Sequence, residues 1–168
     1  MRAMWWWIVV LVLVTYVWAA YYRQPPSVQM LQTTLASFQV DALLQKQPIV
    51  VADQVADQVA DLDAIRRAWF PMATAKEAVA VPGAWSRVGG KYAVIYPRED
   101  AEVLLCAPKC GMVSDDDGAR IPHPDETLVA VPLKAHQLLI LPFRYHFYVT
   151  SEKINVMMLN DWVSWALP

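Results

Sequence analysis

The chain has few glycines and no excess of positive charge. It contains 14 Lys and Arg against 16 Asp and Glu, which gives a formal net charge of −2. Because binding to nucleic acid requires a basic face, this composition argues against a nucleic-acid partner. Five glycines against 12 prolines indicate many short, rigidly turned strands rather than long helices.

Cysteine is also scarce, since Cys106 and Cys110 are the two cysteines of the chain. Two cysteines alone do not make a zinc site, which usually takes four ligands, so we expect no metal and no other cofactor. With Pro108 between them, the two side chains are close enough to pair across a turn. A disulfide and two free thiols both fit this spacing, so cysteine usage assigns no compartment.

Long apolar runs are rare, and the one that could cross a membrane lies at the N-terminus. Residues 4–22 carry no charge and one weakly polar residue, Thr15. As a helix they would extend about 28 Å, close to the hydrocarbon thickness of a bilayer. Aromatic side chains gather at both ends of the run, as they do at membrane–water interfaces: Trp5, Trp6, Trp7, Trp18, Tyr21 and Tyr22.

This pattern predicts a transmembrane anchor over residues 1–23, a proline-rich stalk over residues 24–27 and one β domain over residues 28–168. A cleaved signal peptide is the alternative, because Arg2 gives a charged start and Ala19-Ala20 resembles a cleavage site. The apolar run is longer than the usual signal core of about 7–15 residues. We therefore expect an uncleaved anchor, a single-pass membrane protein and the lipid bilayer as a partner.

The remainder of the chain predicts a mainly β fold. A β-sandwich or barrel is favoured over an α/β sheet, because turn residues recur between the apolar runs at short intervals. One or two short helices are expected, from the segments at residues 37–44 and 62–70, the second ended by Pro71. Strands are predicted at residues 28–33, 47–51, 78–81, 92–96, 102–106, 128–131, 137–141, 147–149 and 154–159.

Two polar segments invite other interpretations. A four-residue unit repeats over residues 51–61 and places aspartates at regular intervals. It lacks the glycine and the bidentate acid of a calcium loop, so we interpret it as a loop or the start of the helix at 62–70. Residues 114–126 are acidic and polar, and we expect an exposed loop there.

Residues 131–149 resemble the second conserved motif of cupin and JmjC-type barrels. Ala135 and His136 open a strand, apolar residues follow as far as Pro142, and an aromatic-rich turn leads to His146. The resemblance implies a cupin-like or jelly-roll barrel. In metal-binding members of the family, a histidine here and an earlier His-x-Asp/Glu pair hold iron for oxidation with 2-oxoglutarate, in the facial arrangement that suits Fe(II).

The chain departs from that motif at the ligand positions. The fifth residue after the proline is Phe147, and His146 would face the opposite side of a strand. His123-Pro124-Asp125 has the letters of the first motif, but it lies in the polar loop and close to the second motif. We therefore expect a protein that is not an enzyme. An oxygenase using His123, His136 and His146, or a ligand-binding barrel, are the alternatives.

A wider set of short motifs resembles small membrane-anchored cupin-like proteins encoded by large icosahedral DNA viruses of algae and amoebae. It comprises the N-terminal apolar run, Leu31-Gln32-Thr33, residues 44–50, Trp69-Phe70 and residues 159–162. The resemblance implies a structural or interaction protein, a minor virion component between the inner membrane and the capsid. Its partners would then be other virion proteins, capsid proteins among them.

Four residues are candidate contact residues for such partners: Arg144, Tyr145, Trp162 and Trp165. Trp85 is a further aromatic candidate. Aromatic anchors dominate binding energy at interfaces, and an arginine beside aromatic rings can stack or bind a carboxylate. The aromatic residues are equally compatible with a place in the core, and Arg144 with a solvated turn.

Overall fold

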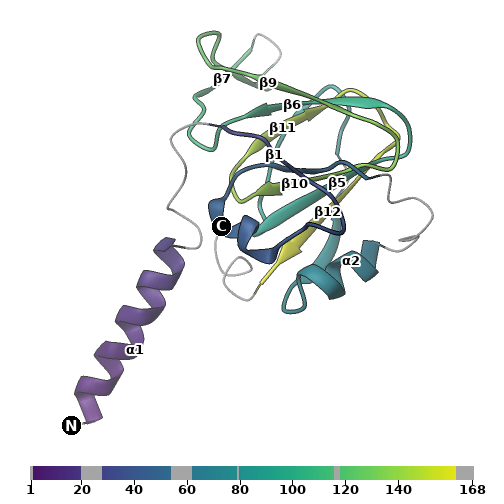
Figure 1. The fold of residues 1–168 in the computed structure, drawn as a ribbon. Coiled ribbons are helices and arrows are strands. Elements are labelled where there is room, and N and C mark those ends of the chain that lie inside the picture. Colours follow the sequence, from purple (N-terminus) through teal and green to yellow (C-terminus); the bar gives the residue numbers. More distant parts are fainter. Residues whose placement is uncertain (1, 20–27, 54–61, 79, 116–117, 162–168) are drawn as a thin grey trace.

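Two β-sheets pack face to face in the computed structural model and form the body of the protein (Figure 1). The structure describes residues 2–19, 28–53, 62–78, 80–115 and 118–161. The helices are α1 (Arg2–Val17), the 3₁₀-helix η2 (Val40–Gln45) and α2 (Leu62–Trp69). The strands are β1 (Leu31–Thr33), β2 (Ile49–Val51), β3 (Thr74–Ala78), β4 (Trp85–Arg87), β5 (Tyr92–Pro97), β6 (Ala101–Cys106), β7 (Met112–Ser114), β8 (Arg120–Pro122), β9 (Val129–Leu133), β10 (Leu138–Pro142), β11 (His146–Val149) and β12 (Ile154–Asn160).

The larger sheet has six strands in the order β1-β2-β10-β5-β12-β3, and the smaller has four in the order β4-β11-β6-β9. A separate hairpin joins β7 to β8. Strand pairing is antiparallel except between β1 and β2. Strands distant in sequence therefore lie side by side, and β10 is bonded to both β2 and β5.

The central strands of the larger sheet bury both faces, because successive side chains of a strand point to opposite sides. On β5, Ala93 and Ile95 enter the core between the sheets, where Val103 and Phe147 of the smaller sheet meet them. Val94, between them, joins a second apolar cluster on the other face. Such strands are near-continuous apolar runs, which is why the sequence shows them clearly.

Short helical segments cover the outer face of the larger sheet. Leu43 of η2 and Phe70, directly after α2, pack on this face in the second cluster. Phe38 stacks on Trp69 with ring centroids 4.1 Å apart. Tyr92 donates a hydrogen bond from its hydroxyl to the Leu43 carbonyl at 3.3 Å. The protein thus has three layers, which are the four-stranded sheet, the six-stranded sheet and the helical cover.

The expected transmembrane anchor over residues 1–23 is wrong. Helix α1 has 16 residues, so it extends about 24 Å, whereas the hydrocarbon core of a bilayer is about 30 Å thick. Among the described residues, no helix is long and apolar enough to cross a membrane. The expected single-pass membrane localisation is wrong for the same reason. Tyr21, Tyr22 and the stalk at 24–27 lie outside the described residues.

Differences in the β domain fall at sheet edges and in the small hairpin. The strand predicted at 78–81 is β3, which ends at Ala78 and is largely exposed because it is an edge strand. The exposed loop expected at 114–126 contains β8, which pairs with β7. Strand β4 was not predicted, since its three residues form no apolar run.

Candidate functional site

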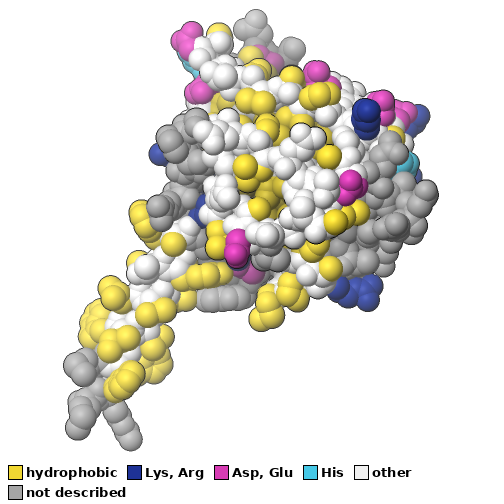
Figure 2. All heavy atoms as spheres, in the orientation of Figure 1, with side chains coloured by type: hydrophobic (Ala, Val, Ile, Leu, Met, Phe, Trp, Pro, Cys, Tyr) yellow, Lys and Arg dark blue, Asp and Glu magenta, His cyan; other side chains and the backbone are white. Residues whose placement is uncertain are grey.

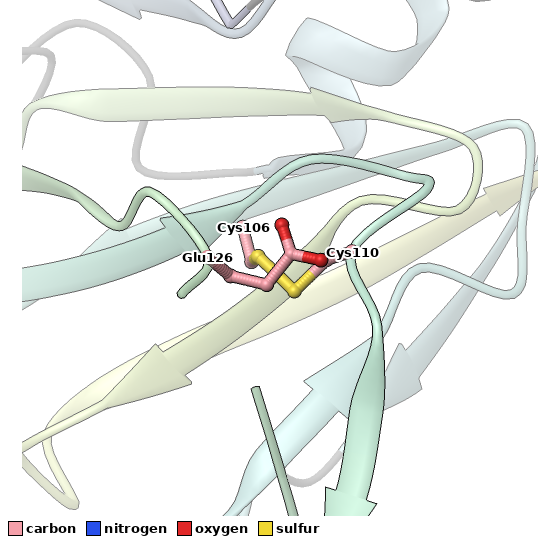
Figure 3. Close-up of side chains that lie close together, drawn as sticks. All are labelled: Cys106, Cys110 and Glu126. Carbon is pink, nitrogen blue, oxygen red and sulfur yellow. A yellow bond between two sulfur atoms is a disulfide. The ribbon is translucent and has the colours of Figure 1, made fainter. Parts of the chain in front are cut away.

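A disulfide joins Cys106 and Cys110 where β6 leaves the smaller sheet (Figure 3). Cys106 is the last residue of β6 and is fully buried, and Cys110 is 8% exposed. A turn between them is closed by the Cys110 amide, which donates to the Ala107 carbonyl at 2.9 Å. This turn brings the two Cα atoms to 6.0 Å from each other, within the range of disulfides.

Glu126 lies against this disulfide and comes from the segment between β8 and β9 (Figure 3). One carboxylate oxygen accepts a hydrogen bond from the Gly111 amide at 2.6 Å. The Glu126 amide in turn donates to the His123 carbonyl at 2.9 Å. One ligand atom from each of Cys106, Cys110 and Glu126 lies within 4.8 Å of the others. Among the described residues this is the one group of three or more metal-ligating side chains so close together.

The strand beside Cys106 carries His146. In the antiparallel register, His146 pairs with Cys106 on one side and with Arg87 on the other. Burial lowers the pKa of His146; a hydrogen bond to the Ala107 backbone opposes this shift and the charge of Arg87 adds to it. His146 is therefore held toward its neutral form next to the disulfide.

Sequence reasoning found the two cysteines but not Glu126. Glu126 and Gly111 are hydrogen-bonded although they are 15 residues apart in the sequence, because the β7–β8 hairpin between them brings them together. A lone glutamate in a polar loop carries no sequence signal for such a contact, because the contact depends on how that hairpin folds back. Cys106, Cys110 and Glu126 thus combine a disulfide, which can be reduced, with a carboxylate beside it.

The three histidines of the oxygenase alternative do not come together within the described residues. His123 lies on the hairpin side, 3.4 Å from the Asp125 carboxylate. His136 lies in the turn before β10, where its Nδ1 is 2.7 Å from the Tyr96 hydroxyl. As predicted from strand alternation, Phe147 rather than His146 enters the core between the sheets.

Of the candidate contact residues, Tyr145 is 1% exposed and belongs to the core. The idea that it is an exposed anchor is wrong, because its ring fills the space between the sheets. Arg144 is half-buried in the turn before β11, with its guanidinium carbon 5.3 Å from the centre of the Phe143 ring. Trp162 and Trp165 lie outside the described residues.

Trp85 is half-buried on the face of the smaller sheet that looks away from the core. Its ring centroid is 5.6 Å from that of Tyr148 on the neighbouring strand, and the two rings are tilted. This cross-strand pair stabilises the edge of the sheet by a few tenths of a kcal/mol to about 1 kcal/mol. Its partly exposed rings remain available as a contact surface.

Helix α1 meets the β domain through its C-terminal part. Lys91 donates hydrogen bonds to the Tyr16 hydroxyl at 3.3 Å and to the Asp161 carboxylate at 3.0 Å. Burial alone would lower the pKa of Lys91, but these hydrogen bonds outweigh it and raise the pKa. Lys46 also donates to the Ala19 carbonyl. These polar contacts are local, and the rest of α1 extends away from the sheets (Figure 1).

No protein-family model matches the sequence, and no curated protein is significantly similar to it. The resemblance to cupin-like proteins therefore stays a prediction.

Proposed function

We propose that the protein is a non-enzymatic interaction protein that presents helix α1 to an apolar groove of another protein. The observation that carries this proposal is the exposure of α1. Figure 2 shows hydrophobic side chains along the visible length of this helix. Trp5, Trp6 and Trp7 are 66%, 72% and 74% exposed, and Leu11 is 68% exposed.

Exposed apolar side chains on this scale favour a bound state. Burying a large apolar side chain fully contributes roughly 1.5–3 kcal/mol, so three tryptophans alone supply a large driving force. Apolar residues occupy consecutive positions from Trp5 to Val14 and not one stripe. A helix that is apolar on all sides needs to be enclosed, and a deep groove satisfies this better than a flat surface.

The interior of the β domain supports a non-catalytic role. The side chains between the two sheets are aliphatic or aromatic, with Ile95, Leu105, Leu139, Tyr145 and Phe147 among the largest. Metal-binding members of the family that the sequence resembles hold iron with histidine and carboxylate side chains, whereas the cluster between the sheets is apolar among the described residues. The β domain then serves as a rigid body from which α1 extends.

The resemblance to viral cupin-like proteins adds one expectation to this proposal. If the chain is a virion component, the protein that receives α1 is another virion protein. Mass spectrometry of purified particles tests this separately, because the chain and its partner would be recovered in a fixed ratio.

A triple variant, Trp5→Ser with Trp6→Ser and Trp7→Ser, tests the role of α1. We expect the wild-type chain in a gently prepared extract of its source to elute in a complex clearly larger than its own 19.0 kDa. The triple variant should elute at its own size, because the apolar contact is lost. Its thermal unfolding should match the wild type, since these side chains lie outside both apolar clusters of the β domain.

Met72→Ser is the matched control, because Met72 is 89% exposed but lies between α2 and β3. This variant should elute with the wild type. Retention of the triple variant in the large complex would contradict the proposal. So would recovery of the same large complex from the purified chain alone, since the occupant of the apolar surface would then be another copy.

A further inference from the structure

The group formed by Cys106, Cys110 and Glu126 combines two sulfur atoms and a carboxylate within 4.8 Å of one another. In the disulfide both sulfur atoms are bonded to each other. Reduction would release two thiols at the same place. Two cysteines alone are too few ligands for zinc, and Glu126 adds a third ligand beside them.

We propose that reduction of the Cys106–Cys110 disulfide creates a zinc site, in which both thiolates and the Glu126 carboxylate bind the ion. This inference concerns the smaller sheet and is independent of the role proposed for α1. It makes the disulfide a redox-controlled switch between a closed bond and a metal-binding state.

The donor set matches the chemistry of zinc. Zinc binds thiolate sulfur and carboxylate oxygen in tetrahedral sites, whereas calcium and magnesium take oxygen ligands only. Structural zinc sites commonly space two cysteines by two to four residues, and three residues separate Cys106 from Cys110. Three protein ligands leave the fourth tetrahedral position to a water molecule.

The local geometry allows the change. Two sulfur atoms bound to one zinc ion lie about 3.8 Å apart, given Zn–S bonds of about 2.3 Å in tetrahedral geometry. The sulfurs must therefore separate, which requires the turn residues Ala107 to Lys109 to shift while β6 and the Gly111 amide keep their places. Glu126 is already fixed near them by the Gly111 amide. The carboxylate is thus preorganised for an ion that arrives after reduction.

A dithiol or phosphine reductant supplies two electrons, the S–S bond breaks, and two protons complete the two thiols. Zn²⁺ then binds, two S–Zn bonds form and the two thiol protons are released to solvent. Reoxidation by a disulfide exchange partner expels the ion and closes the S–S bond again.

Cobalt(II) and zinc titrations of the full chain test this proposal. The protein is reduced with a phosphine, freed of reductant under anaerobic conditions and titrated with Co²⁺, followed by Zn²⁺. We expect one equivalent of Co²⁺ to bind with thiolate-to-cobalt charge-transfer absorption, and Zn²⁺ to displace it. The oxidised protein should give no such absorption.

Glu126→Gln provides the decisive variant, because it keeps both cysteines and removes one ligand. We expect it to weaken zinc affinity by roughly tenfold or more. Asp125→Asn is the matched control, since Asp125 is its neighbour, is 92% exposed on its side chain and lies outside the group. It should bind as the wild type does.

The proposal is overturned if the reduced wild type shows no thiolate absorption with Co²⁺. It is equally overturned if Glu126→Gln binds as tightly as the wild type, because metal held by loose thiols of an unfolded chain would not depend on Glu126. Circular dichroism of each reduced sample reports whether the sheets are intact.

Discussion

Gly90 occupies a position where the fold has no room for a side chain. A Cβ atom there would lie 2.7 Å from the Leu159 carbonyl oxygen and 2.9 Å from the Asn160 side-chain oxygen. The first contact is with backbone, which cannot rotate away. We predict that Gly90→Ala lowers the free energy of unfolding by about 1–3 kcal/mol, measured by urea denaturation.

Gly89→Ala is the matched control for this prediction. No atom lies within 4 Å of a Cβ built at Gly89. Its free energy of unfolding should stay within about 0.5 kcal/mol of the wild type. Equal effects of the two substitutions would show that space at Gly90 is not the cause.

Tyr145 gives the fold a sensitivity to alkaline pH. Burial raises its pKa from 10.0 to about 12. Below pH 10 the Tyr145 hydroxyl is protonated in both the folded and the unfolded chain, so its ionisation does not lower the free energy of unfolding there. As pH rises from 10 to 12, the unfolded chain ionises first, so stability falls by about 2–3 kcal/mol. Tyr145→Phe should therefore lose less stability than the wild type over this interval, as measured by urea denaturation at each pH. Equal losses would contradict the assignment.

For single residues, the sequence predicted which side of a strand a side chain faces better than whether that side chain is buried. Strand alternation correctly placed Phe147 inside and His146 on the other face. Tyr145 could be core or surface, because an aromatic residue at the start of a strand fits both. Tyr145 is buried because the two sheets pack against each other around its ring, and this packing is not visible in the sequence.

Among the elements, the turn between Cys106 and Cys110 is closed by the disulfide. The sequence separation of these residues is 4. Closing so small a loop is expected to contribute about 2 kcal/mol through the entropy of the unfolded chain. Reduction without metal should lower the free energy of unfolding by about this amount, measured by urea denaturation with and without a phosphine. An unchanged midpoint of unfolding would contradict this expectation.

The strands that sequence analysis predicted well are those made mainly of apolar residues, including β6 and β11, which bury one face more than the other. Strands β5 and β10 are continuous apolar runs, and β12 is apolar apart from Asn155 and Asn160; such runs are visible without any knowledge of partners. Edge strand β3 and the hairpin of β7 and β8 are largely polar or very short. Their strand conformation comes from pairing with a neighbour, which no local pattern encodes.

For the N-terminal helix α1, the sequence shows the apolar composition but not the length of the helix. Its apolar composition is plain in the sequence, and composition alone suggested a span of 19 residues or so. The structure ends α1 at Val17, which leaves 16 residues. Helix length depends on where the backbone leaves the helical conformation, and an uninterrupted apolar run does not mark that point.

For the whole molecule, sheet order and the group at Cys106 depend on contacts between distant segments. The β-rich fold follows from apolar runs and turns. The pairing of β10 with both β2 and β5 does not, because these strands are distant in the sequence and become neighbours only when the sheet forms. Glu126 likewise lies beside the disulfide only because segments distant in the sequence pack together.

If another protein encloses α1, photo-crosslinking in the source cells should capture that protein. A photoreactive amino acid is placed at Leu11 and, as the control, at Met72. Both positions are strongly exposed, at 68% and 89%, but only Leu11 lies on α1. We expect the Leu11 position to give one dominant adduct with a different protein, and the Met72 position to lack this adduct. Adducts from Leu11 that contain only lipid, only a second copy of the chain or no partner would contradict it.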